Sequence, residues 1–134
     1  MYKALLWLRL REDTFEDEFE SRNEKVARLA EFVREQQALG LPTMKAELFP
    51  LNGTYYLTVT VDANRRRHEA LWIGDLIGRV NSELPASYGL LHERDDEALD
   101  WPGPNAFKVT VIARGTAAER FDPFLSPCNP VIED

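Results

Sequence analysis

Hydrophobic and polar residues alternate along several short stretches of the chain, as expected for β-strands with one buried face. Residues 54–62, TYYLTVTVD, show this alternation most cleanly. Residues 2–10, YKALLWLRL, also alternate, but Leu5 and Trp7 make the second face apolar as well. That composition suits a central strand that is covered on both sides. The segments expected to form strands are residues 2–10, 44–50, 54–62, 87–94 and 106–114.

Two longer stretches have the 3.6-residue period of an amphipathic helix. The first begins after Asp13 or Thr14, either of which can cap it, and ends at Gly40. The second covers residues 66–84 and ends before Pro85. The apolar positions expected to face the core are Phe15, Phe19, Val26, Leu29 and Val33 in the first helix and Ala70, Ile73, Ile77, Val80 and Leu84 in the second.

The order of these segments predicts one α+β domain that spans residues 1–134. Asn52-Gly53 lies between two strands and indicates a β-hairpin. The predicted order is βαββαββ, which places two helices on one face of a mainly antiparallel sheet. This is a split βαβ, ferredoxin-like arrangement with one added strand. We expect residues 115–134 to follow as an extended, Pro-rich C-terminal tail packed on the domain.

The chain ends with FDPFLSPCNPVIED, which is more apolar and richer in proline than most chain termini. Proline favours an extended, polyproline-like path and cannot pair as a central strand. We expect this segment to form a strap over an edge or over the open face of the sheet. The same strap can hold acidic residues where a basic partner would meet them. The expected anchors of the strap are Phe121, Phe124, Leu125, Cys128 and Ile132.

The composition is that of a folded domain with an acidic surface. The formal net charge is −7 and the pI is near 4.9, so the surface repels nucleic acid and anionic lipid and attracts basic partners. Alternatively, the charge only keeps the protein soluble. Cys128 is the only cysteine, which excludes an internal disulfide and a multi-thiolate metal site and favours a cytoplasmic location. The apolar run before Arg9 is too short for a signal peptide or a membrane span.

The residues that carry chemistry do not assemble into an enzyme site along the sequence. No glycine lies in a phosphate-binding loop between a strand and a helix. His68 follows three arginines and is expected to be solvated or to cap a helix. His92 lies near Asp95 and Asp96, so it could ligate a divalent ion, but acidic residues in a turn more often only face water. We therefore expect no catalytic residue, no metal and no cofactor.

Acidic residues form three clusters along the sequence. Seven of them fall within residues 12–24, a second group lies in residues 93–100 beside Trp101, and the last closes the chain. Carboxylates next to a tryptophan suit a binding rim around an aromatic anchor. Trp101 can equally be a plug that closes this loop onto the sheet.

Three segments of the chain form a recognisable set: SYGLLHERDDE (87–97), FKVTVIARG (107–115) and DPFLSPCNPVIED (122–134). Together they resemble the immunity protein 7 family of bacterial polymorphic toxin and contact-dependent inhibition systems. The resemblance implies a cytoplasmic protein that binds and neutralises a cognate toxin domain, with no catalysis and no cofactor. From the charge, we expect a basic toxin, such as a nuclease. The candidate toxin-binding residues are Asp95, Asp96, Glu97, Trp101, Asp122, Glu133 and Asp134.

A small-ligand-sensing regulatory α+β module is the alternative function, because sheets of this kind often host regulatory ligands. It would require a pocket between the helices and the sheet. The sequence indicates no oligomeric state.

Overall fold

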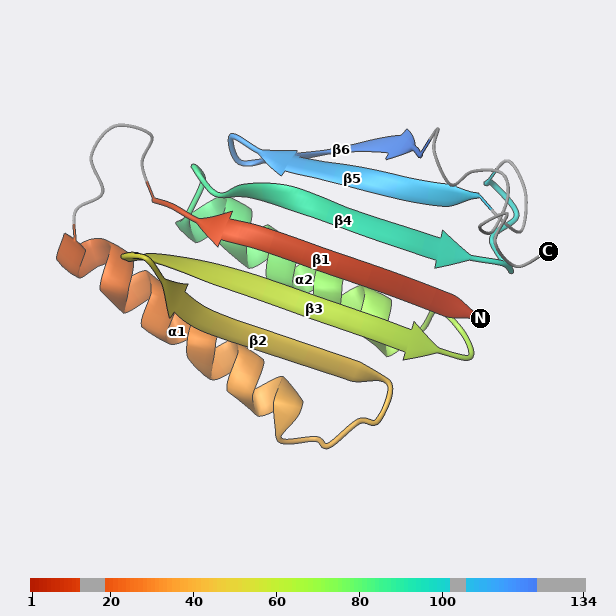
Figure 1. Cartoon of the computed structure of the whole chain (residues 1–134), viewed down its shortest axis with the longest axis horizontal. Helices are drawn as coiled ribbons and strands as arrows, with labels where there is room; N and C mark the ends of the chain where they lie inside the picture. Colours follow the sequence, from red (N-terminus) through yellow and green to blue (C-terminus); the bar gives the residue numbers. More distant parts are fainter. Residues whose placement is uncertain (13–18, 102–105, 123–134) are drawn as a thin grey trace.

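The computed structural model describes residues 1–12, 19–101 and 106–122. Within these ranges the chain forms two helices and one six-stranded antiparallel sheet (Figure 1). In the sheet, the strands lie in the order β2-β3-β1-β4-β5-β6. The elements are β1 (Tyr2–Leu10), α1 (Phe19–Gln37), β2 (Met44–Leu51), β3 (Thr54–Ala63), α2 (His68–Glu83), β4 (Tyr88–Asp95), β5 (Phe107–Ala113) and β6 (Thr116–Phe121).

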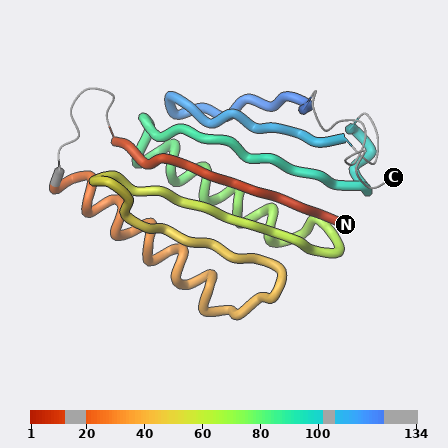
Figure 2. Tube along the Cα trace, in the orientation of Figure 1, coloured from red at the N-terminus to blue at the C-terminus, as the bar shows by residue number. Residues whose placement is uncertain are grey.

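Each helix connects two strands that have a third strand between them. β3 lies between β1 and β2, and β1 lies between β3 and β4. Both helices pack on one face of the sheet, and no described helix covers the opposite face (Figures 1 and 2). The predicted α+β class, with two helices and a mainly antiparallel sheet, is confirmed. No helix in the described ranges combines the length and the apolar composition that crossing a membrane requires.

The sheet has one strand more than the sequence analysis expected. Residues 116–121 were assigned to the extended tail, but they form β6, which pairs with β5. Arg114 and Gly115 make the connecting turn with positive φ values of 55° and 74°. Every residue of β6 is exposed, so the strand has no apolar alternation to indicate it. The turn was missed because arginine rarely adopts this left-handed conformation.

The core lies between the sheet and the helices. Alternate residues of β1, from Tyr2 to Leu10, are buried, and the cross-strand partners Leu57, Val59 and Val61 are buried with them. The helices contribute the stripes that their periodicity predicts: Val26, Leu29 and Val33 from α1, and Ile73, Ile77 and Val80 from α2, together with Leu84 just beyond its end. Phe15 and the side chain of Phe19 lie outside what the structure describes.

The second face of β1 differs from the expectation. β1 is central in the sheet, but Leu5 and Trp7 are exposed on the face away from the helices, with fractional exposures of 51% and 39%. The apolar second face of this strand is therefore exposed on the surface and is not covered by any described part of the chain. This surface is the first place to look for a functional site.

Candidate functional site

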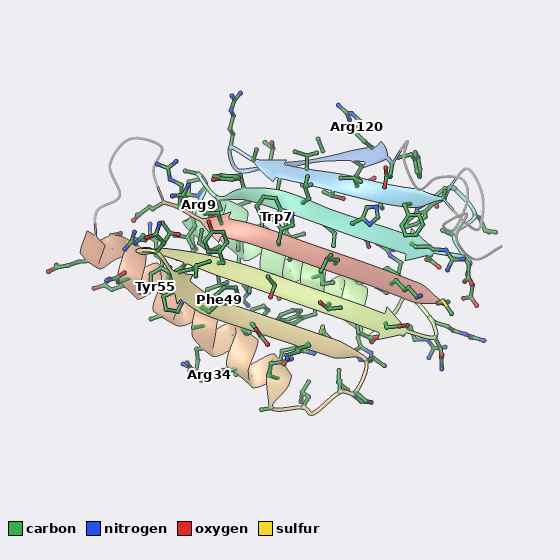
Figure 3. The ribbon with its side chains drawn as sticks, in the orientation of Figure 1. Trp7, Arg9, Arg34, Phe49, Tyr55 and Arg120 are labelled. Atoms are coloured by element: carbon green, nitrogen blue, oxygen red, sulfur yellow. The ribbon has the colours of Figure 1, made fainter. Side chains whose placement is uncertain are left out.

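The sheet face opposite the helices is here called the open face. Figure 3 shows it turned toward the viewer, with Trp7, Arg9 and Phe49 on it and both helices behind. Successive side chains of a strand point to opposite faces, so cross-strand partners of Trp7 share its side. Trp7 pairs with Leu90, and Leu90 pairs with Val111. The exposed large apolar and aromatic residues of the open face are Leu5, Trp7, Leu51, Tyr88, Leu90 and Val111.

A hollow of about 480 Å³ lies at the β6 side of the open face. Leu5, Trp7, Leu90 and Val109 contribute its apolar lining, and Arg120 of β6 lies at its border. The hollow has a volume typical of binding sites, and its lining is predominantly apolar, as such sites usually are.

Aromatic and cationic side chains cluster at one end of the open face. The guanidinium of Arg9 donates a hydrogen bond to the Tyr88 hydroxyl at 3.0 Å. The ring of Trp7 meets the ring of Tyr88 edge to face, with centroids 6.4 Å apart. These contacts hold three large side chains in fixed positions relative to one another.

A partly buried pair of a histidine and a carboxylate lies at the other end of the open face. His92 Nε2 is 2.8 Å from Asp122 Oδ2, and the His92 ring stacks on Phe107 with centroids 4.9 Å apart. The backbone N–H of Asp122 donates to the Phe107 carbonyl at 2.8 Å. Asp122, a candidate toxin-binding residue, therefore joins the end of β6 to β4 and β5. Among the described residues, no group of three or more His, Cys, Asp or Glu could hold a metal ion.

The three acidic candidates after β4 differ in accessibility. Asp95 is buried, and its Oδ1 accepts the backbone N–H of Glu97 at 3.0 Å. Asp96 Oδ1 accepts a hydrogen bond of 2.7 Å from the Met1 ammonium, which lowers the pKa of the Asp96 carboxyl. The charges of that ammonium and of Arg94 add to the effect. Glu97 remains exposed, with Oε1 3.9 Å from Arg65 Nε.

Trp101 is buried rather than presented at the surface. Its ring packs edge to face against Phe121 at 6.3 Å, and Lys108 Nζ lies 4.9 Å from its centroid. Of the two interpretations of Trp101, the plug that closes a loop onto the sheet is the one these contacts describe. Phe121, an expected strap anchor, is described at the end of β6 in this same contact. The remaining predicted residues lie outside the described part of the chain: Phe124, Leu125, Cys128, Ile132, Glu133 and Asp134.

Comparison with known families decides the class of this protein. A family model described as Immunity protein 7 matches residues 1–134, the whole of the chain given. The chain belongs to the immunity protein 7 family. The resemblance seen in three segments of the sequence is thus confirmed, and the family implies an immunity protein directed against a toxin. Proteins of this kind are generally not catalytic. Neither a curated protein nor a solved structure matches the chain.

A buried polar network at one end of the sheet was not found by sequence reasoning. In this immunity protein, the Tyr2 hydroxyl donates to Glu93 Oε2 at 2.5 Å, and both residues are buried. Arg66 and Lys108 each bring a cationic nitrogen to 3.8 Å from the Glu93 carboxylate. Burial, followed by the charge of Glu93, raises the pKa of Tyr2 far above its usual value. From the sequence, Glu93 was only one member of the second acidic cluster.

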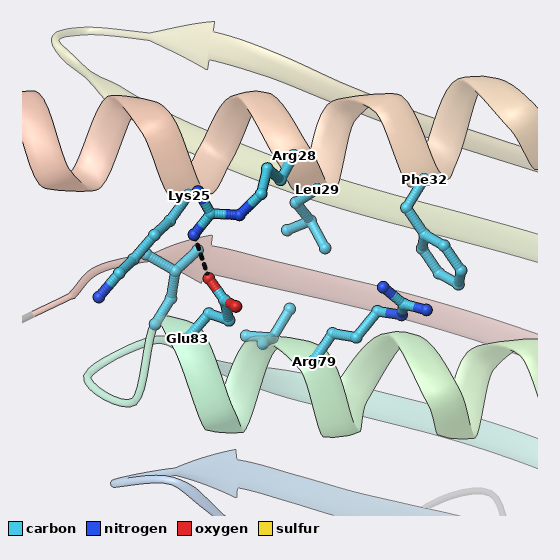
Figure 4. A pocket seen from close by; sticks show the side chains of 8 residues that line it. Lys25, Arg28, Leu29, Phe32, Arg79 and Glu83 are labelled. Carbon is cyan, nitrogen blue, oxygen red and sulfur yellow. Dashed lines mark hydrogen bonds and ion pairs between the residues drawn. The ribbon is translucent and has the colours of Figure 1, made fainter.

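The groove between the two helices of this immunity protein is small. Its volume is about 140 Å³, below the roughly 300–1,000 Å³ of typical ligand pockets. Arg28 reaches across it to Glu83 at 2.7 Å, and Arg79 lies over the ring of Phe32 (Figure 4). The groove therefore offers little room for the metabolite that a ligand-sensing module would bind.

A larger hollow of about 420 Å³ lies where the loop after α1 meets the start of α2. His68 and Glu69 are among its lining residues, and His68 Nε2 is 2.8 Å from the buried carboxylate of Glu69. His68 itself is largely exposed, as its predicted solvated role requires. The acidic group of this hollow is thus already paired within the protein.

Proposed function

We propose that this immunity protein binds its cognate toxin domain directly and neutralises it in the cytoplasm, without catalysis. The match of the family model to residues 1–134 carries this proposal, because an immunity protein must act on a toxin. Direct binding is the simplest way for a small domain to do so. It requires only a complementary surface and no active site.

The acidity of the chain supports a basic partner. A net charge of −7 would speed the encounter with a toxin whose substrate groove is positive, as in a nuclease. Asp96 and Glu97, which are partly or largely exposed beside the end of β4, are the described acidic candidates best placed to take part. Glu133 and Asp134 remain candidates of the same kind.

Co-expression tests the proposal most directly. The cognate toxin domain should arrest growth of a susceptible host, and this chain should restore growth and copurify with the toxin. The control is an unrelated acidic protein of similar size, which should do neither. Rescue without a complex, or a toxin that is chemically altered after rescue, would contradict neutralisation by direct binding.

Charge neutralisation at the acidic loop should slow association. For the double variant Asp96→Asn with Glu97→Gln, we expect an association rate about three- to ten-fold lower at low salt and a smaller difference at high salt. The variant leaves Asp95 intact, because its buried carboxylate accepts a backbone hydrogen bond. The measurement is stopped-flow or surface-based kinetics against an inactive toxin domain.

The matched control removes two charges elsewhere. Glu24→Gln with Glu35→Gln changes the net charge by the same amount on the exposed side of α1. Equal slowing by both pairs would mean that total charge, and not the loop after β4, sets the rate.

A further inference from the structure

We infer that the open face of the sheet is the surface on which the toxin domain docks, and that the toxin presents there an apolar patch bordered by carboxylates. This inference rests on the proposed function and names the surface that performs it. Of the candidate toxin-binding residues predicted from the sequence, Asp122 borders this face, whereas Asp96 and Glu97 lie on the loop after β4.

The first argument is the continuity of the apolar surface. Trp7, Leu90 and Val111 are cross-strand neighbours in one row, and in the next row Leu5 and Val109 lie on either side of His92. Cβ atoms of such neighbours lie about 4.5–5.5 Å apart, so these side chains form one patch. Elsewhere in the described ranges, exposed large apolar residues such as Leu39, Leu71 and Leu99 stand outside this patch. Soluble proteins rarely expose a contiguous apolar patch unless it binds something.

The second argument is the kind of side chain and how firmly it is held. Tryptophan, tyrosine and arginine are the residues most often responsible for binding energy at interfaces. Trp7, Tyr88 and Arg9 contact one another on the open face, through an edge-to-face ring contact and a hydrogen bond. Because these contacts already restrict the side chains, a partner loses less conformational entropy in fixing them.

The third argument is area. Six strands about 4.8 Å apart and about eight residues long at 3.3 Å each give a face of roughly 630 Å² in projection. Side chains roughen this surface, so its accessible area approaches the roughly 800 Å² per partner of a standard interface. The open face is therefore large enough to dock one toxin domain.

The fourth argument is charge, and it selects the partner's chemistry. By register, the open face carries more basic than acidic side chains, although the chain as a whole has a net charge of −7. A partner that presents carboxylates at the border complements this face. A second copy of the same face would set like charges against each other. The basic residues are Lys3, Arg9, Lys45, Arg94 and Arg120, and the acidic ones are Glu47, Asp62 and Asp122. Lys45 Nζ pairs with Glu47 Oε1 at 3.0 Å, Asp122 pairs with His92, and Arg94 is buried, which leaves Lys3, Arg9 and Arg120 as the basic side chains that border the apolar patch.

The two electrostatic proposals act at different ranges. Steering depends on the total charge and on exposed acids such as Glu97, and it affects the association rate. Docking depends on the local groups that become desolvated, and it affects mainly the dissociation rate. A toxin with a basic groove and a mixed apolar and acidic patch beside it satisfies both.

The test compares variants of the open face with a matched variant elsewhere. The full chain is titrated against a catalytically inactive form of the cognate toxin domain. We expect Trp7→Ala and Leu90→Asp each to weaken binding about 100-fold or more, and Arg120→Glu about 10-fold. Leu71→Asp, which places the same charge on an exposed leucine of α2, should change the dissociation constant less than about two-fold.

Thermal unfolding and size-exclusion chromatography accompany each titration. Loss of binding by the open-face variants, with an unchanged melting temperature and a monomer profile like the wild type, supports the inference. Unchanged binding by these variants overturns it. So does unchanged binding with a much lower melting temperature, which would mean that another part of this chain, such as the segment after Asp122, covers the face. A change of oligomeric state would assign the face to a second copy instead.

The outcome also separates this inference from the proposed function. If the wild-type chain does not bind the toxin domain at all, direct binding itself fails. If the wild type binds and the open-face variants bind equally well, direct binding stands and only the location is wrong.

Discussion

Replacing Gly89 by alanine is expected to destabilise the protein by about 3 kcal/mol or more, which is the upper end for overpacking. Gly89 lies in β4 between Leu8 of β1 and Ile112 of β5. A Cβ atom at this position would lie 1.8 Å from the Trp7 carbonyl oxygen and less than 3 Å from two further backbone atoms of β1. Because the obstacle is backbone in the middle of the sheet, the strands themselves would have to separate.

A glycine in α2 provides the control with the opposite sign. A Cβ atom at Gly78 would meet nothing within 4 Å, and the residue lies inside the helix. Gly78→Ala should therefore stabilise the protein by about 0.5–1 kcal/mol through its higher helix propensity. Urea unfolding of both variants measures the two effects. If Gly89→Ala shifted the midpoint no more than Gly78→Ala does, β1 and β4 would not approach as closely as described.

The helices and the central strands could be predicted from the sequence because the period of the apolar residues indicates which side of each element is buried. The stripes Leu29–Val33 and Ile73–Val80 predicted the buried sides of both helices, and the structure has them. The strand β6 was not predicted, since its residues are all exposed and its backbone pairing with β5 leaves no hydrophobic alternation in the sequence. A strand held at an edge by main-chain hydrogen bonds leaves no hydrophobic pattern to detect.

The acidic loop shows why a site is harder to predict than a fold. Glu93, Asp95 and Asp96 are close in sequence, but β4 extends to Asp95, and its alternation turns Glu93 and Asp95 to the helix side. Glu93 thereby joins Tyr2 in a buried network, while only Asp96 and Glu97 stay near solvent. Strand register decides which face each residue occupies, and register was not available from one sequence.

The apolar open face is a second case in which the sequence pattern identified the residues but not their role. Leu5 and Trp7 correctly indicated that the second face of the first strand avoids water in some state of the protein. Their pattern cannot distinguish burial within the chain from burial against a partner, because both remove the same surface from water. The structure makes that distinction for the described residues by leaving both side chains exposed.

Removing the hydroxyl of Tyr2 is expected to cost about 2 kcal/mol near neutral pH, as for a hydrogen bond to a charged group. Tyr2→Phe keeps the buried ring but takes the closest donor from the Glu93 carboxylate, whose cationic neighbours Arg66 and Lys108 are 3.8 Å away. Tyr56→Phe on the open face is the control and should change the free energy of unfolding by less than about 0.5 kcal/mol.

The effect of Tyr2→Phe should shrink at alkaline pH, because the raised pKa of Tyr2 keeps its hydroxyl neutral in the folded state. In the unfolded chain, this tyrosine ionises at about pH 10. Below that pH the stabilisation is complete, and above it the wild type loses up to about 1.4 kcal/mol per pH unit from this one group. The variant lacks the group, so the two stability curves should converge as the pH rises from about 10. Urea unfolding from about pH 8 to about pH 11 measures this, and a constant gap between the curves would show that Tyr2 ionises alike in both states.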